Sequence, residues 1–518
     1  MKRASSANTA LNPEQRKIVL AVSAAAVTLL TLSASFNYVL PDMLTDLDAT
    51  DSQTDMARQI PTIAALLVIF IAGAVGERMG ARRVMLASTV LYALGSVIVT
   101  VAPIMPVATL GLLFANVGKS ALFVVGLAHM SSQIASKEGR AAAFATFSAV
   151  MPVTYLLMPL LAGVMLANSS WRTVATVWCL SGLLGTIAVW RLLPVDQHEE
   201  RTTGELLTPA LAGLVLAALV QVVTILPDSG LTTRVAFTMT VGIVALITLW
   251  IAMRRMSHPT LSLAPLRHGG LVLLLIVLIL TMFANLWFYM TMALQYMFGL
   301  TSLQVAVVLV PAQLVTIIGA GLAGKLVQRR GVALAGTVLL VIVAVALATS
   351  AFIDLATPVW LAVGILSIYS AAAVGSGVAL TNAIMDLAGD GEDGSAAAFR
   401  GAASNLGSAI GVAAMTSIVF FAAASSLQSQ AIAAGIDPTT ASEVATAMRD
   451  GATSEDTSSL YSVPVAEVDS INSMQQQAYA AGLQAHGIVG AAVTLVAAGL
   501  FYVVRRRQET PPLEVYAE

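Results

Sequence analysis

The feature that most constrains this chain is a succession of long apolar runs, each about the length of a membrane-spanning helix. A helix needs about 20 mostly apolar residues to cross the hydrocarbon core of a bilayer. Fourteen such runs alternate with short polar or Pro/Gly-rich turns. They cover residues 18–40, 58–76, 84–102, 107–130, 144–167, 173–193, 208–226, 235–253, 271–291, 303–324, 332–352, 358–383, 401–424 and 482–504. This pattern predicts an all-α polytopic membrane protein.

The composition excludes several other classes of protein. Only 10% of the residues are charged and 58% are hydrophobic, whereas a soluble domain carries about 25% charged residues. A net charge of -2 leaves no basic surface for nucleic acid. One cysteine, Cys179, can form neither an intrachain disulfide nor a thiolate metal cluster. We therefore expect the lipid bilayer as a partner, and neither nucleic acid, nor a cofactor, nor a metal.

The distribution of basic residues predicts the topology. If the N-terminus is placed in the cytoplasm, the segments on that side hold 20 of the 26 Lys and Arg residues, as the positive-inside rule requires. An error of one helix would invert every later loop and destroy this asymmetry. We therefore expect both termini to be cytoplasmic. A composition rich in Ala, Val and Gly suggests a multi-pass protein of a bacterial plasma membrane.

Two similar turns follow the second and the tenth runs. The first contains Gly73, Gly76, Glu77, Arg78 and the pair Arg82-Arg83, and the second contains Gly321, Gly324, Lys325 and the pair Arg329-Arg330. Glycines allow helices to approach closely, and basic residues anchor the cytoplasmic edge. Glu77 can bridge to Arg78 or Arg82, or cap a neighbouring helix. The repetition indicates an internally duplicated transporter.

These turns resemble the loop between the second and third helices of the major facilitator superfamily. The fifth run contains Met158-Pro159-Leu160-Leu161-Ala162-Gly163, followed by Trp171-Arg172, which is similar to the antiporter motif of that family. Stretches around Gln295, Pro311, His258-Pro259 and Asn405 resemble the branch of fourteen-helix drug:proton antiporters.

The resemblance implies a major facilitator fold of two six-helix bundles with two additional helices. The expected domains are a cytoplasmic tail at 1–17, a bundle at 18–193, a linker at 194–207, two additional helices at 208–253, a cytoplasmic loop at 254–270, a second bundle at 271–504 and a tail at 505–518. The second bundle includes a long polar outer segment at 425–478, in which Asp437-Pro438-Thr439 predicts the start of a short helix over 439–449. A further helix over 465–481 would lead into the last span.

The family resemblance also implies an inner gate and export of small amphipathic molecules by alternating access, coupled to protons. The gate residues would be Glu77, Arg78, Arg82 and Arg329, and Pro159 and Gly163 would belong to the antiporter helix. The sequence departs from the family pattern at Leu32, where an Asp is usual, and at Asn116 and Lys119, where Arg and Gln are usual. No Asp or Glu lies near the middle of a span, which separates this chain from typical exporters of cations.

Lys119 is the most distinctive candidate for a site residue. A Lys near the centre of a span costs about 2.5–3.5 kcal/mol on insertion scales, and such residues usually face a cavity or a partner. Lys119 could attract an anion and also titrate, or it could pair structurally. Arg400, at the start of the thirteenth run, is a second cavity cation, an anchor at the membrane interface, or a partner for Asp386.

Polar groups at membrane depth complete the set of candidates. Asn37 and Asn116 lie in the first and fourth runs, and Gln313 lies in the tenth. The ninth run and the residues after it carry Asn285, Tyr289 and Gln295, with helical spacing placing Asn285, Tyr289 and Met292 on one face. These residues either bridge helices or line the path of a substrate.

The leading hypothesis is a monomeric secondary active exporter of hydrophobic or amphipathic compounds, of the multidrug type, that exchanges a small-molecule substrate for protons. The alternative is an exporter of an anionic metabolite or lipid-like molecule, with Lys119 facing the substrate. A membrane enzyme or a sensor is a third class, but the sequence offers neither a nucleophile-base arrangement nor a cluster of metal ligands.

Overall fold

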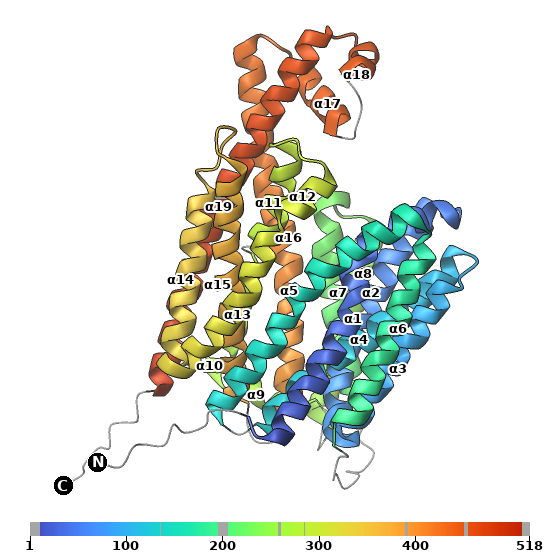
Figure 1. Cartoon of the computed structure of the whole chain (residues 1–518), viewed down its shortest axis with the longest axis vertical. Helices are drawn as coiled ribbons and strands as arrows, with labels where there is room; N and C mark the ends of the chain where they lie inside the picture. The colour runs from blue at the N-terminus through green and yellow to red at the C-terminus, as the bar shows by residue number, and fades with distance from the viewer. Residues whose placement is uncertain are drawn as a thin grey trace, which may run out of the picture.

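The computed structural model describes residues 11–134, 136–194, 206–256, 261–283, 285–388, 392–449 and 454–509. Within these ranges the chain contains fourteen candidate membrane spans, each long and apolar enough to cross a bilayer, which confirms the predicted number. The long helices lie side by side and run roughly along the length of the molecule (Figure 1). The expected motif His258-Pro259 and much of the two predicted tails and the linker lie outside the described residues.

The first six spans are single helices. They are α1 (Pro13–Asp46), α2 (Asp51–Met79), α3 (Ala81–Thr100), α4 (Met105–Gln133), α5 (Lys137–Asn168) and α6 (Trp171–Leu192). Capping boxes begin two of them, because Asn12 and Thr50 each exchange hydrogen bonds with a Gln three residues later. Two additional helices follow, α7 (Leu207–Ser229) and α8 (Thr233–Arg255), which pack on each other and through α7 on α2 and α16.

The second half contains shorter and much longer helices than the apolar runs predict. They are α9 (Ala264–Arg267), α10 (Gly269–Met282), α11 (Leu286–Tyr296), α12 (Ser302–Val308), α13 (Val310–Arg330), α14 (Val332–Ser350), α15 (Val359–Asp386), α16 (Asp393–Ala434), α17 (Pro438–Arg449), α18 (Ser454–Tyr461) and α19 (Val465–Glu509). The expected helices over 439–449 and from 465 onward are observed as α17 and the start of α19.

Two spans are broken where an unbroken helix was expected. The ninth span is divided into α10 and α11, with Asn285 as the residue before α11. The tenth is divided into α12 and α13 at Leu309, because Pro311 lies in the first turn of α13 and cannot donate a backbone hydrogen bond to the preceding turn. Asn285 therefore does not share a helix face with Tyr289 and Met292, and that part of the prediction is wrong.

The two halves repeat one packing pattern. In the first half α3 packs against α4 and α6, and α1 packs against α5 and α6. In the second half α14 packs against α15 and α19, and α10 packs against α16 and α19. The halves meet through two equivalent pairs of helices, α2 with α16 and α13 with α5. The duplication suggested by the repeated turns is thus present in three dimensions.

One glycine in each of the two repeated turns ends a spanning helix. Gly80 follows α2 with φ of 88°, and Gly331 follows α13 with φ of 80°. A side chain is strained in this backbone conformation, whereas glycine is not. Each glycine therefore ends one spanning helix and allows the next to begin in the adjacent residue.

The two ends of the molecule differ in character. At one end, α16 and α19 extend beyond the other helices and form, with α17 and α18, a small helical assembly that we call the cap (Figure 1). Its core includes Val444, Val468 and Ile471. At the opposite end α1 begins and α19 ends, and the terminal turns of the helices there carry Arg82, Arg140, Arg254, Arg329 and Arg505. We call these the cap end and the basic end.

Candidate functional site

A large cavity lies between the two bundles. Its volume is about 770 Å³, and it is lined by residues of α1, α4 and α5 from the first bundle and of α11, α12, α13, α15 and α16 from the second. The wall is mostly apolar and aromatic. The aromatic lining residues are Tyr38, Phe123, Phe144, Phe147, Tyr155, Trp287 and Tyr369. A concave, mainly apolar space with a few polar groups is the usual form of a site for a small organic molecule.

The cavity opens toward the cap end. The lining side chains of Tyr38, Tyr155 and Leu160, in the cap-side halves of α1 and α5, are exposed by 45%, 42% and 36%. The lining residues nearest the basic end, such as Phe144 and Ala397, are buried, each with 1% exposure. The structure therefore has an open path on one side of the cavity and packed side chains on the other.

Arg400 is the one charged side chain among the described residues that line the cavity. It lies in the second turn of α16, and its Nε donates a hydrogen bond to the Thr381 hydroxyl of α15 at 2.9 Å. It makes no contact of the expected kind with Asp386, which pairs elsewhere. A guanidinium in an apolar wall attracts an anion more strongly than it would in water, because the local dielectric is low.

Lys119 lies beside the cavity, outside its lining residues. Its Nζ donates hydrogen bonds to the Ser33 hydroxyl at 2.7 Å and to Oδ1 of Asn116 at 2.9 Å. Ser33 itself lines the cavity. The amine is thus held by two neutral acceptors from α1 and α4, and one of them, Ser33, borders the space between the bundles.

The other predicted polar residues divide into two groups. Asn37, Asn285, Gln295 and Gln313 all line the cavity, as does Pro159 of the antiporter-like helix.

Three predicted residues lie elsewhere. Asn116 holds Lys119. Tyr289 is buried on the opposite face of α11, where its hydroxyl bonds to Thr416 at 3.1 Å. Gly163 faces open space, since a Cβ there would meet nothing within 4 Å.

Glu77 connects the bundles at the basic end. It lies in the last turn of α2, and its Oε1 accepts a hydrogen bond from the Ser395 backbone N–H at 3.1 Å. Ser395 is in the first turn of α16, where unpaired backbone N–H groups and the helix dipole favour a carboxylate. A Cβ on the adjacent Gly394 would lie 2.5 Å from this oxygen. Only a glycine lets the carboxyl approach so closely.

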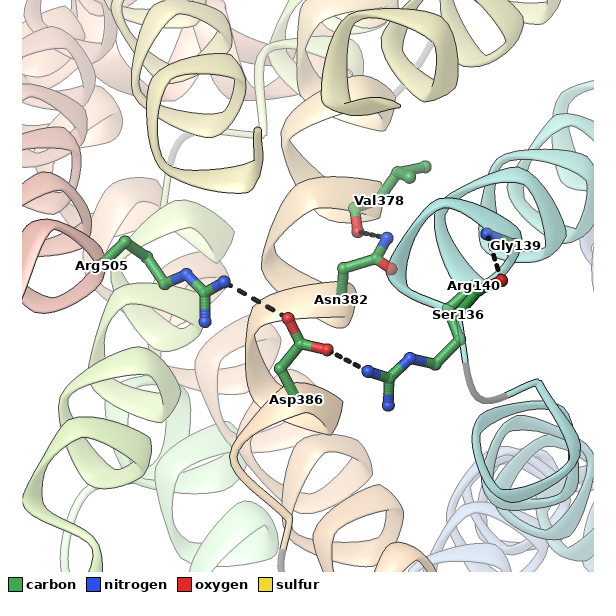
Figure 2. Close-up of polar contacts among 7 residues, drawn as sticks. All are labelled: Ser136, Gly139, Arg140, Val378, Asn382, Asp386 and Arg505. Atoms are coloured by element: carbon green, nitrogen blue, oxygen red, sulfur yellow. Dashed lines mark hydrogen bonds and ion pairs between the residues drawn. The ribbon is translucent and has the colours of Figure 1, made fainter. Parts of the chain in front are cut away.

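A second contact between the bundles is an ion-pair chain around Asp386 (Figure 2). Arg140 of α5 lies 2.5 Å from Oδ1 of Asp386 at the end of α15, and Arg505 of α19 lies 3.3 Å from Oδ2. The three side chains are 16%, 7% and 5% exposed, respectively. The Ser136 hydroxyl caps α5 and so fixes the turn that carries Arg140. One carboxylate thereby holds both bundles at the basic end.

The remaining residues of the expected inner gate lie near these contacts. Arg82 donates to the Trp190 carbonyl of α6 at 2.8 Å, a contact within the first bundle. Arg78 is in the last turn of α2. Arg329 is exposed in the last turn of α13. Within this group, the hydrogen bond between Glu77 and Ser395 crosses between the bundles.

Sequence reasoning missed two features of this arrangement. The sequence marks Arg140 only as one of the many basic residues expected on the cytoplasmic side, and its partner Asp386 is 246 residues away. His486 is fully buried in α19, with its ring 4.4 Å from that of Tyr289 and neither ring nitrogen hydrogen-bonded. A charge at the inner end of a span was the available signal for Asp386, and a polar residue within an apolar run was the signal for His486.

The sequence matches the family model of the Major Facilitator Superfamily over residues 21–412. The chain belongs to the major facilitator superfamily. As a member of this superfamily it is a multi-pass transporter with a small-molecule substrate. No match was found among curated proteins.

Several solved structures of major facilitator transporters and related proteins share the fold. The human organic anion transporter MFSD10 (TETRAN) has a TM-score of 0.64 at 14% sequence identity, covering 95% of this chain and 100% of that one. A bacterial homologue of the iron transporter ferroportin, in an outward-facing state with soaked iron, has a TM-score of 0.57 at 10% identity, covering 96% and 100%. The proton:xylose symporter XylE has a TM-score of 0.52 at 12% identity, covering 92% and 94%. At these identities the likeness concerns the fold alone.

Proposed function

We propose that this transporter exports small hydrophobic or amphipathic molecules by alternating access, and that amphipathic organic anions are its best substrates. The observation that carries the proposal is the cavity between the bundles, open at the cap end and closed at the basic end. Its aromatic wall suits the apolar part of a substrate, and Arg400 suits a carboxylate, sulfonate or phosphate group. The substrate would be held between the bundles, so one chain is sufficient for the site.

The contacts at the basic end support the proposed cycle. Glu77 with Ser395, and Arg140 with Asp386, join the bundles there and must separate before the cavity can open on that side. We propose that this end faces the cytoplasm, in agreement with the positive-inside rule. The transporter would then load a substrate while the basic end is open, and release it through the cap end of a bacterial plasma membrane.

Coupling to protons needs a titratable group within the membrane. No Asp or Glu is among the described residues that line the cavity. We propose Lys119, which is held by two neutral acceptors, and His486, which is fully buried, as the candidates, because neither is hydrogen-bonded to an acidic side chain. Transport of a solute against its gradient would then be lost in Lys119→Gln or His486→Gln, while exchange of solute across the membrane is kept.

A second candidate function is export of lipophilic cations, the multidrug activity of the antiporter branch that the sequence resembles. The aromatic faces of Tyr155 and Trp287 favour it, because such faces attract organic cations. Arg400 opposes it.

Efflux from a host stripped of its own pumps separates the two candidates. Cells would be loaded with carboxyfluorescein or, separately, with ethidium, and tested with and without an uncoupler. Wild type would be compared with Arg400→Gln and Lys119→Ala. We expect uncoupler-sensitive efflux of carboxyfluorescein that falls at least ten-fold in Arg400→Gln, because a charge-assisted contact worth about 1.5–3 kcal/mol is lost. Ethidium efflux unchanged in Arg400→Gln, with no efflux of carboxyfluorescein, would establish the cation exporter instead.

A further inference from the structure

A second hollow lies on the outer side of the contact between α5 and α13. Its volume is about 550 Å³. It is lined on α5 by residues from Ala142 to Val153, on α13 by residues from Ile317 to Gln328, and on α1 by Val27. We call it the α5–α13 groove. The central cavity uses other faces of the same helices, so α5 separates the two spaces.

The groove faces the hydrocarbon region of the membrane. Ile318 and Leu322, which flank the groove residue Gly321 on α13, are 61% and 59% exposed although they belong to a spanning segment. Large apolar side chains exposed within a span contact lipid. Gly321 itself leaves the space open, since a Cβ there would meet nothing within 4 Å. The groove is therefore accessible from the bilayer.

The length of the groove matches one leaflet. Eleven residue steps separate Ile317 from Gln328 on α13, and a rise of 1.5 Å per residue gives a length of about 16 Å. Half of a hydrocarbon core of about 30 Å is about 15 Å. The groove begins near the middle of the membrane and ends at the basic end, so it has the depth of an acyl chain in the leaflet on that side.

Basic residues at the end of the groove nearest the basic end select the lipid headgroup. Lys325 lies in its lining, and Arg329 and Arg330 follow in the next turn of the same helix, all three exposed. No acidic residue is among the described residues that line the groove. Basic residues at a membrane surface attract anionic lipid headgroups. The rest of the lining is apolar or small, with Thr146 and Gln328 as the other polar members.

We propose that the α5–α13 groove binds an anionic phospholipid, with one acyl chain between α5 and α13 and the phosphate at Lys325. The lipid is a resident of the contact between the bundles, distinct from the transported molecule. It stabilises the arrangement in which the basic end is closed, because α5 and α13 belong to different bundles and the chain fills the space between them. This inference does not depend on which substrate the central cavity carries.

Native mass spectrometry of the full-length purified protein tests the proposal. The protein would be titrated with phosphatidylglycerol or phosphatidylcholine of identical acyl chains. We expect wild type to retain phosphatidylglycerol in preference, and Lys325→Gln to reduce that preference on the order of five-fold, the factor expected for one basic residue near an anionic surface. Gly321→Leu fills the groove and should reduce binding of both lipids. Ala149→Leu, from the opposite wall, repeats this test if Gly321→Leu does not fold.

Three controls make the result specific. Gly364→Leu replaces a glycine whose Cβ also meets nothing within 4 Å but which lies on α15 away from the groove. Arg254→Gln removes a basic-end charge from α8. Both should bind lipid as wild type does. Arg400→Gln distinguishes a resident lipid from a transported one, since only the latter would occupy the central cavity. A preference for phosphatidylglycerol that survives Lys325→Gln, or is lost in Arg400→Gln, would overturn the proposal.

Discussion

The α2–α16 and α5–α13 contacts occupy equivalent places in the two bundles, yet they close the basic end in different ways. At α2–α16, Gly73 packs on the backbone of Gly394, and Glu77 bonds to the start of α16. At α5–α13, Gly324 packs on Ala145, but the neighbouring Gly321 faces an open groove. The ion pair that closes this second contact joins Arg140 of α5 to Asp386 of α15 and involves no residue of α13. The duplicated architecture thus determines how the helices pack, whereas the polar groups that join the bundles differ between the two contacts.

The largest effect should come from Asp386→Asn. Removing one member of a buried ion pair costs about 3–5 kcal/mol, and here the two ion pairs of Asp386, with Arg140 and with Arg505, are lost together. We expect the basic end to open. Alkylation of a cysteine placed at Phe144, in a Cys179→Ser background, should accelerate by more than ten-fold. Asp354→Asn, an exposed carboxylate outside this cluster, is the control and should leave the rate unchanged. Equal rates in both variants would show that Asp386 does not hold the bundles together.

A smaller effect is expected from Gly324→Val at the packed part of the α5–α13 contact. The new Cβ would lie 2.6 Å from the Ala145 Cβ, so the helices must move apart. Overpacking of this kind costs about 1–3 kcal/mol. The thermal unfolding midpoint should fall, and the Phe144→Cys label should react faster. Gly364→Val, on α15 in open space and outside the groove, supplies the matched comparison and should have neither effect. A similar loss in both variants would count against a tight contact at Gly324.

Glu77→Gln should weaken the α2–α16 contact by about 1 kcal/mol. The amide oxygen of Gln can still accept the Ser395 hydrogen bond, so only the charge is lost. Cysteine labelling at Phe144 should accelerate about five-fold. Gly394→Ala should have a larger effect, because its Cβ displaces the carboxyl altogether. If labelling accelerated more in Glu77→Gln than in Asp386→Asn, the α2–α16 contact would be the stronger of the two, contrary to this account.

The smallest effect on transport should come from the cap, which belongs to neither contact. Hydrogen bonds from Thr440 hold the pKa of the Asp437 carboxyl below its usual range. The carboxylate therefore stabilises α17 at neutral pH, and this contribution is lost as the pH falls through the lowered pKa. Asp437→Ala should speed hydrogen exchange at the start of α17 without changing efflux. Asp437→Asn keeps a capping side chain that does not titrate, so its exchange should lose the acid dependence.

The sequence predicts the membrane architecture well, because apolar length and basic loops are local signals. It does not predict the break before α11, since no proline marks it, nor the full length of α16, whose small polar residues are compatible with a helix beyond the membrane. Asn37, Gln295 and Gln313 were recognised as polar groups at membrane depth and line the cavity. Lys119 was recognised too, but its hydrogen bonds to Ser33 and Asn116 depend on tertiary packing. Pairing of Arg140 with Asp386 is equally invisible, because no local pattern relates residues so far apart.

Distances between the bundles at both ends test the central claim of alternating opening most directly. Pairs of spin labels would be placed at Met79 and Arg330 on the basic end and at Ile104 and Phe352 on the cap end, all exposed positions, in a Cys179→Ser background. Electron–electron double resonance would compare this protein with its Asp386→Asn variant. We predict that the variant lengthens the basic-end distance and shortens the cap-end distance. Distances that stay fixed at both ends, or lengthen at both, would contradict alternating access.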